Sequence, residues 1–126
     1  MLSTTLTPEP RRAITRYAKR QLTEALKANY SFSITGFLVD AHVVANAAVG
    51  VIYADARRDG TGRFDDGHLI RTSDVRDIRQ FGGRWLIQTL NSTYVIVTFK
   101  QHVGRRSLDL FLAMQSNVFI ASQRLH

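Results

Sequence analysis

Residues 63–99 decide the fold of this chain, and they read RFDDGHLIRTSDVRDIRQFGGRWLIQTLNSTYVIVTF. Three dipeptides typical of tight turns divide this stretch: Asp66-Gly67, Gly82-Gly83 and Asn91-Ser92. The runs between them are rich in β-branched and aromatic residues, which favour strands. The spacing therefore predicts an antiparallel meander whose successive strands are joined by two-residue loops.

The loops also predict a strand register, because a two-residue loop fixes which residues face each other. It pairs Phe64 with Leu69, Ile78 with Ile87, and Ile87 with Ile96. The three isoleucines then form one cross-strand row, a contact that stabilises a sheet face. The same registers place Arg79 beside Leu86 and Val97 on the opposite face.

The last strand of the meander, residues 93–99, is apolar on both faces. Its second face must therefore be covered, either by a helix or by closure of the sheet into a small barrel. Trp85 shares a face with Ile87, and we expect its side chain to be core or half-buried.

Residues 7–29 predict a basic amphipathic helix that follows a loose tail, residues 1–6. Thr7 is a favourable N-cap and Pro8 suits the first helical position. Apolar residues recur three and four positions apart and are expected to face the core: Ile14, Tyr17, Ala18, Leu22, Ala25 and Leu26. Basic residues fall on the opposite side of this helix.

Three further segments carry weaker signals. Residues 30–34 alternate apolar residues with serine, which suggests a short strand. An alanine-rich apolar stripe favours a helix over residues 37–48, followed by a strand over 49–56, although the β-branched residues in 37–48 also fit a strand. Residues 107–120 fit a helix capped by Ser107, and an alternating pattern leaves a strand open; we favour the helix.

These elements predict an α+β fold in one domain, residues 1–126. The N-terminal helix packs on a twisted antiparallel sheet, or on a small, partly open barrel, formed by the meander of residues 49–99. The C-terminal segment, residues 104–126, supplies a second helix.

Composition excludes several classes of function. The chain has no cysteine, so disulfides, thiolate chemistry and cysteine-based zinc sites are excluded. The four histidines, at positions 42, 68, 102 and 126, have no metal-binding spacing, and we expect no metal and no cofactor. Asp65-Asp66 and Ser73 fit turns better than catalysis, so we expect no enzyme. No signal peptide or apolar span is evident, which predicts no membrane insertion and a cytoplasmic location.

A formal charge of +7 is the strongest functional signal in the composition. The excess lies near the two ends of the chain, whereas arginines and aspartates nearly balance in the middle, where we expect some of them to pair. We therefore select the terminal cations as candidate binding residues: Arg11, Arg12, Arg16, Lys19, Arg20, Lys27, Arg105 and Arg106. The alternative interpretation is an ordinary solvated helix face.

The central stretch also contains a pattern of matched positions: Arg63, Phe64, Asp66, Gly67, Ile70, Thr72, Ser73 and Val75, then Asn91, Ser92 and Tyr94. This pattern, RF-x-DG-x-x-I-x-T-S-x-V followed by N-S-x-Y, resembles small β modules in uncharacterised proteins of phages and proteobacterial mobile elements. The resemblance covers residues 50–98. It implies a β fold and a phage or mobile-element origin, and in that case location in the host cytoplasm, and it implies no particular activity.

Two functions follow as hypotheses. The first is a small, non-enzymatic protein that binds nucleic acid through a basic helix face. The second is a protein inhibitor of a host defence complex, of the anti-CRISPR or anti-restriction type. A homo-oligomer is also open, most simply a homodimer, with the last strand of the meander and residues 41–48 as the apolar surfaces that would join the copies.

Overall fold

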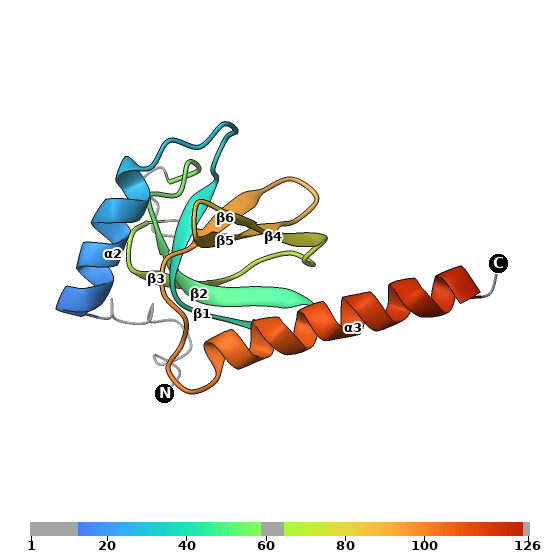
Figure 1. The fold of residues 1–126 in the computed structure, drawn as a ribbon. Coiled ribbons are helices and arrows are strands. Elements are labelled where there is room, and N and C mark those ends of the chain that lie inside the picture. Colours follow the sequence, from blue (N-terminus) through green and yellow to red (C-terminus); the bar gives the residue numbers. More distant parts are fainter. Residues whose placement is uncertain (1–12, 59–64, 125–126) are drawn as a thin grey trace, which may run out of the picture.

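The computed structural model describes residues 13–58 and 65–124, and within them two helices and six strands form one α+β unit (Figure 1). The elements are α2 (Arg16–Lys27), β1 (Gly36–Val44), β2 (Ala47–Tyr53), β3 (His68–Arg71), β4 (Asp77–Phe81), β5 (Arg84–Gln88), β6 (Thr93–Ile96) and α3 (Gly104–Arg124). The predicted class, with a helix at each end of the sheet-forming region, is confirmed.

The sheet has the order β3-β2-β1-β6-β5-β4 and does not close into a barrel. Each outer half is an antiparallel three-stranded unit, and β1 and β6 join the halves as a parallel pair. The prediction of one continuous antiparallel meander was wrong, because β3 and β4 lie at opposite edges. The link between β3 and β4 runs along the ends of other strands. Val75 N–H donates to Asn46 O, in the turn between β1 and β2, at 2.7 Å. Arg76 N–H donates to Gln88 O, the last residue of β5, at 2.7 Å.

The predicted registers are partly correct. Ile78 pairs with Ile87, and Arg79 with Leu86, as expected. The β5–β6 register was wrong by two residues, since Ile87 faces Tyr94, and Ile96 faces Trp85. The turn centres one residue earlier than Asn91-Ser92, because Thr89 N–H donates to Ser92 O at 2.9 Å. A shift of two residues preserves the side of the sheet, so all three isoleucines still share one core cluster.

The β3 strand pairs differently from the expected hairpin. Leu69 faces Val51 of β2, and Phe64 lies outside the described residues. The Asp66-Gly67 turn itself is present and leads directly into β3, with Gly67 at a φ of 90°. Turn chemistry therefore located this bend but not the partner of the strand that follows it.

The helix predicted over residues 37–48 was wrong. This segment is β1 and the start of β2, joined by a tight turn in which Ala45 and Asn46 have φ values of 47° and 65°. Two successive positive φ values are typical of the hairpin turn that matches strand twist. A bulge at Asp40, with a φ of 55°, shifts the register of β1 against β2. The bulge disrupts the two-residue alternation that would have marked a strand.

Residues 30–34 form no strand, contrary to expectation, and belong to the loop that precedes β1. Their alternation instead supports an aromatic cluster. The Tyr30 ring lies 5.7 Å from the Phe81 ring and 6.2 Å from the Phe37 ring, measured between centroids. The Tyr30 hydroxyl donates to Ala25 O at 2.8 Å, so the loop is fixed to the end of α2.

One helix covers each face of the sheet. The two helices together bury both apolar faces of the last strand, β6. Leu22 and Ala25 of α2 pack with Leu86 and Val95 on one face. On the other face, Leu108 and Phe111 of α3 join the cluster that contains the isoleucines. The two faces of β5 and β6 are therefore both internal.

The buried stripe of α2 is narrower than predicted. Ala18, Leu22 and Ala25 are buried, whereas Tyr17 and Leu26 are 63% and 47% exposed. The helix begins after Thr15, whose hydroxyl accepts from Ala18 N–H at 3.1 Å. The predicted Thr7 cap and the tail of residues 1–6 lie outside the described residues.

The C-terminal helix is confirmed, and α3 begins at Gly104, before the predicted cap Ser107. The Ser107 hydroxyl instead donates to Gly104 O at 2.6 Å and accepts from Val43 N–H at 2.8 Å. It therefore ties the first turn of α3 to β1. In Figure 1 the helix then continues well past the edge of the sheet.

Candidate nucleic-acid interface

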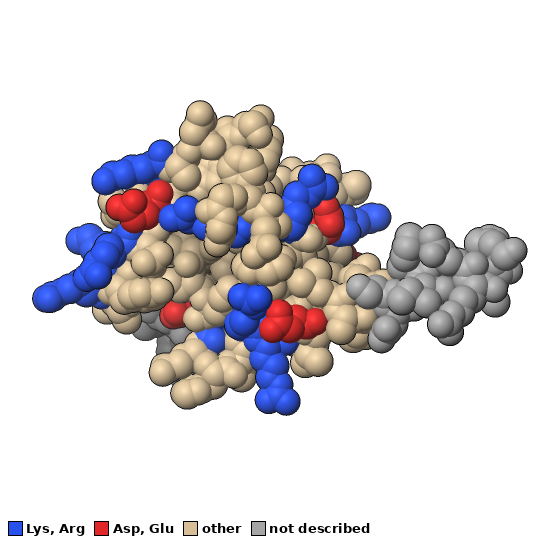
Figure 2. Space-filling view, viewed as in Figure 1, with Lys and Arg blue, Asp and Glu red and all other residues tan. Residues whose placement is uncertain are grey.

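The cations of α2 lie on its outer face, opposite the residues that pack on the sheet. Arg16, Lys19, Arg20 and Lys27 are all exposed. The helix places them along about 16 Å of its length, at the usual rise of about 1.5 Å per residue. Figure 2 shows the resulting group of Lys and Arg side chains over α2, at the left of the view.

A second basic segment lies between the last strand and α3. It is fixed to the bulge of β1, where Asp40 N–H donates to the Thr98 hydroxyl at 2.9 Å and Lys100 N–H donates to Ala41 O at 2.9 Å. His102 has a φ of 71°, a conformation that residues other than glycine rarely adopt. The bulge and the loop thus hold Lys100 and His102 in a defined place.

A hollow in the surface lies between the second basic segment and the N-cap of α2. One cavity of about 490 Å³ is lined by Thr15, Asp40, His42, Val49, Val51, Leu69, Lys100, Gln101 and His102. A second, of about 510 Å³, shares Lys100, Gln101 and His102 and extends to Arg105 and Arg106. We call these two adjoining cavities the basic hollow. Thr15 caps α2, so the first turn of that helix forms part of the rim.

Arg105 is held in place by three neighbours. Its guanidinium carbon lies 5.3 Å from the Trp85 ring centroid and 5.9 Å from that of Phe99. Its Nε donates to Asp109 at 3.1 Å, one turn further along α3. Trp85 is half-buried, as expected, and its ring lies against the guanidinium of Arg105. Arg105 therefore forms a fixed wall of the hollow.

Most other cations of the candidate surface form no ion pair with a described carboxylate, although Asp40 lines the hollow together with Lys100. Among the described residues, no ion pair involves Arg16, Lys19, Arg20, Lys27, Lys100 or Arg106. In the centre of the chain the expected pairing is present, since Arg79 contacts Asp77 at 2.7 Å and Arg57 contacts Asp55 at 2.8 Å. Arg71, Arg76 and Arg84 in the centre likewise form no ion pair with a described residue, so unpaired cations also occur outside the two ends of the described chain.

His42 is the one described residue lining the hollow that has a buried polar atom without a hydrogen-bond partner. Its Nδ1 is buried and has no hydrogen-bond partner among the described residues. Burial, and secondarily the charge of Lys100, lower the pKa of His42 below its usual value. The lowered pKa favours the neutral imidazole, and the buried Nδ1 of this cavity-lining residue is left without a partner.

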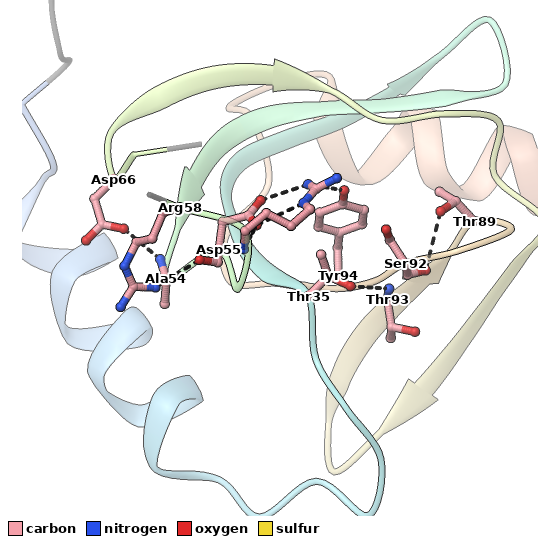
Figure 3. A network of polar contacts seen from close by, with 10 residues as sticks. Thr35, Ala54, Asp55, Arg58, Asp66, Thr89, Ser92, Thr93 and Tyr94 are labelled. Atoms are coloured by element: carbon pink, nitrogen blue, oxygen red, sulfur yellow. Dashed lines mark hydrogen bonds and ion pairs between the residues drawn. The ribbon is translucent and has the colours of Figure 1, made fainter. Parts of the chain in front are cut away.

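A separate polar network lies away from the hollow and is structural. Asp55, fully buried after the end of β2, accepts from Arg57 Nε at 3.0 Å and from Nη2 at 2.8 Å, and Nη2 also donates to the Tyr94 hydroxyl at 2.9 Å (Figure 3). The Asp55 contact raises the pKa of Arg57 further. This network fixes the loop after β2 to β6.

The structure brings together part of the predicted site. Arg105 and Arg106 at the start of α3 line the hollow, whereas α2 reaches it through its N-cap, Thr15. None of the described α2 cations, Arg16, Lys19, Arg20 and Lys27, is among the residues that line it. Arg11 and Arg12 lie outside the described residues. Lys100, His102 and His42 also line the hollow, although charge counting did not select them. The polar run of residues 100–102, which two residues separate from the Arg105-Arg106 pair, was the available signal.

Other kinds of site find no support in the described part of the chain. No group of three or more histidine or acidic side chains there could hold a metal ion. None of the helices in residues 13–58 and 65–124 combines the length and the apolar composition needed to cross a membrane. No protein-family model, curated protein or solved structure matches this chain.

Proposed function

We propose that this chain binds nucleic acid, without catalysing a reaction, through the basic hollow and the outer face of α2. One observation carries the proposal: Lys100, Arg105 and Arg106 line one hollow that reaches Thr15, the N-cap of the basic helix α2, and no described carboxylate forms an ion pair with Lys100 or Arg106. A solvated charge stripe would not require a cavity lined from both ends of the chain.

The phosphate backbone is the part of a nucleic acid that such a surface recognises. Duplex DNA carries one phosphate about every 3.4 Å along each strand, so about 16 Å of α2 spans several phosphates. Lys and Arg contacts to phosphates position the polymer and carry no sequence information by themselves. We therefore expect binding that depends strongly on salt and only weakly on sequence.

The test is a titration of nuclease-treated protein with single- and double-stranded DNA and RNA over a salt series. The logarithm of the binding constant should fall linearly with the logarithm of the salt concentration, with a slope of about −0.9 for each phosphate neutralised on duplex DNA. The double variants Arg16→Gln/Arg20→Gln and Lys100→Gln/Arg106→Gln should each weaken binding and make the slope shallower by about 2.

The matched control is Arg76→Gln/Arg79→Gln, which removes the same charge from exposed positions beside and within β4, at the far edge of the sheet. Its effect should be clearly smaller, because these arginines lie away from the hollow. Equal losses in the control and in the two test variants would show a response to net charge alone and would overturn the assigned surface.

If none of the nucleic acids binds at low salt, the proposed function fails. The inhibitor of a host defence complex then becomes the function to pursue. A stoichiometric protein partner recovered from nuclease-treated host lysate would support it, and the Arg16→Gln/Arg20→Gln variant would show whether the same surface is used.

A further inference from the structure

One face of the sheet is only partly covered by α2. Ala18 of this helix packs on Val39 of β1 and Val51 of β2. Leu69 of β3 faces Val51, so its side chain lies on the same side of the sheet, yet it is 46% exposed. The cavity of about 490 Å³ lies over this open part of the face, and we call it the inner cavity. The adjoining cavity of about 510 Å³ is the outer cavity.

Strand pairing aligns a row of side chains across the sheet at the inner cavity. Arg71 of β3 faces Val49 of β2, and Val49 faces His42 of β1. Neighbouring strands lie about 4.8 Å apart, so this row crosses about 10 Å of the sheet. Lys100 continues the row beyond β1, because its N–H donates to Ala41 O of that strand. Val49, His42 and Lys100 line the cavity, and Arg71 lies next to it.

The row has a cation at each end and an uncharged middle. Arg71 is exposed and forms no ion pair with a described residue, and the same holds for Lys100. Between them lie the apolar Val49 and His42, whose lowered pKa favours the neutral imidazole. A ligand that follows this row would therefore meet positive charge, then an uncharged surface, then positive charge again.

The inner and outer cavities differ in chemistry. Val49, Val51 and Leu69 give the inner cavity an apolar wall, and Asp40 adds a carboxylate, which repels phosphate and accepts hydrogen bonds from N–H donors. The outer cavity holds Arg105 and Arg106, and its one described carboxylate, Asp109, is already paired with Arg105. A free phosphate would use only the cations. The wall and the carboxylate suit a ligand that also has apolar faces and N–H donors.

We propose that the inner cavity receives one unstacked base of a single-stranded nucleic acid, while phosphates on either side of that base contact Lys100 and Arg71. This inference rests on the proposed function and narrows it to single strands. A base has apolar faces, and adenine, cytosine and guanine present amino donors at their edges. The volume of the cavity lies within the range of about 300–1,000 Å³ that is usual for small-ligand sites. In a duplex the bases are stacked and paired, so none could enter without being flipped out.

Three labelled oligonucleotides of equal length, titrated with nuclease-treated full-length protein at one salt concentration, test the proposal. They are a mixed-sequence single strand, the corresponding duplex, and a single strand of abasic sugar-phosphate units. The intact strand should bind about fivefold more tightly than the abasic strand, the low end of what one stacked base contributes. It should also bind more tightly than the duplex, although the duplex has the higher charge density.

The outcomes separate this inference from the proposed function. Equal affinities of the intact and abasic strands, or tighter binding of the duplex, would overturn the base site and leave the proposed function standing. If none of the three binds, both proposals fail.

The variant Leu69→Thr locates the base contact. Threonine is smaller and polar but compatible with a strand, so it removes part of the apolar wall and retains β3. Affinity for the intact strand should fall, and affinity for the abasic strand should stay unchanged. Arg71→Gln should instead weaken both strands alike, because it removes a phosphate contact.

The matched control is Leu90→Thr, at a leucine that is 71% exposed between β5 and β6, and it should change neither affinity. Circular dichroism checks that each variant remains folded. If a folded Leu69→Thr chain loses affinity for both strands equally, or for neither, the base does not contact this wall and the proposal is overturned.

Discussion

The Asp55 carboxylate is fully buried, whereas 41% of the side chain of its partner, Arg57, is exposed. This asymmetry decides what each residue contributes. A buried carboxylate needs a counter-charge, since leaving one unpaired costs about 3–5 kcal/mol. A half-exposed guanidinium that loses its carboxylate can instead turn toward water. Removing the charge of Arg57 and removing the charge of Asp55 should therefore lower the free energy of unfolding by different amounts.

We expect Arg57→Met to destabilise the fold by about 3 kcal/mol, because it leaves the Asp55 charge buried without its partner. Asp55→Asn should cost less, since the amide oxygen can still accept from Arg57 N–H, which lies 2.7 Å from the present carboxylate. Urea unfolding of both single variants and of the double variant measures the two costs and their coupling. A larger loss for Asp55→Asn would contradict this account.

His42 should give the fold a specific sensitivity to acid. Its pKa is lowered in the folded chain by burial and by Lys100, so the unfolded chain binds a proton more readily. Stability should therefore fall as pH drops below the unfolded value of about 6.5, and the loss should level off below the folded value.

The measurement is the free energy of unfolding at about pH 7.5 and pH 5.5, on either side of that unfolded value, for wild type and for His42→Gln. The variant should lose less stability between the two pH values, because glutamine takes up no proton. An identical loss in both proteins would mean that other groups cause the acid sensitivity.

At the scale of elements, glycine-containing turns were predictable from the sequence and alanine-containing turns were not. Gly82 and Gly83 adopt φ values of 58° and 81°, so the dipeptide located its hairpin and the correct β4–β5 register. The turn at Ala45 and Asn46 needs similar angles without a glycine, and its alanine-rich surroundings resembled a helix. The partners of β3 depend on contacts distant in sequence, which local turn chemistry cannot specify.

Gly104 decides how closely α3 approaches β1. A Cβ at this position would collide with Ala41 O and would lie 2.8 Å from the Phe99 Cβ. Helix propensity alone would make Gly104→Ala stabilising by up to about 1 kcal/mol. The collision with backbone should outweigh that gain, since overpacking typically costs about 1–3 kcal/mol.

We therefore expect Gly104→Ala to lower the free energy of unfolding and to displace the start of α3 from the bulge of β1. Because Lys100 is fixed to the same bulge, affinity for nucleic acid should fall as well under the proposed function. Chemical denaturation gives the sign directly, and a stability equal to or above wild type would contradict the close approach.

At the scale of the whole molecule, the basic hollow depends on an arrangement that the sequence did not reveal. Charge counting selected both ends of the chain, and two of the cations it selected, Arg105 and Arg106, line the hollow. It could not show that the bulge at Asp40 and the loop at His102 form the floor between them. Those features arise from the parallel pairing of β1 and β6, which brings residues 98–100 against β1.

The fold also divides α3 into a part that the core needs and a part that it does not. Leu108 and Phe111 belong to the buried cluster, and burying each contributes about 1.5–3 kcal/mol. The C-terminal part of α3 continues past the edge of the sheet (Figure 1). Removal of residues 116–126 should therefore leave the melting temperature nearly unchanged, while removal of residues 101–126 should prevent folding, since the total stability of a domain is only about 5–15 kcal/mol.

The chain that ends at Gln115 tests which part of the molecule contacts nucleic acid under the proposed function. It retains the basic hollow and α2, so its affinity for a short oligonucleotide at a fixed salt concentration should match that of the full chain. A truncated chain that folds but no longer binds would place part of the nucleic-acid contact on the end of α3.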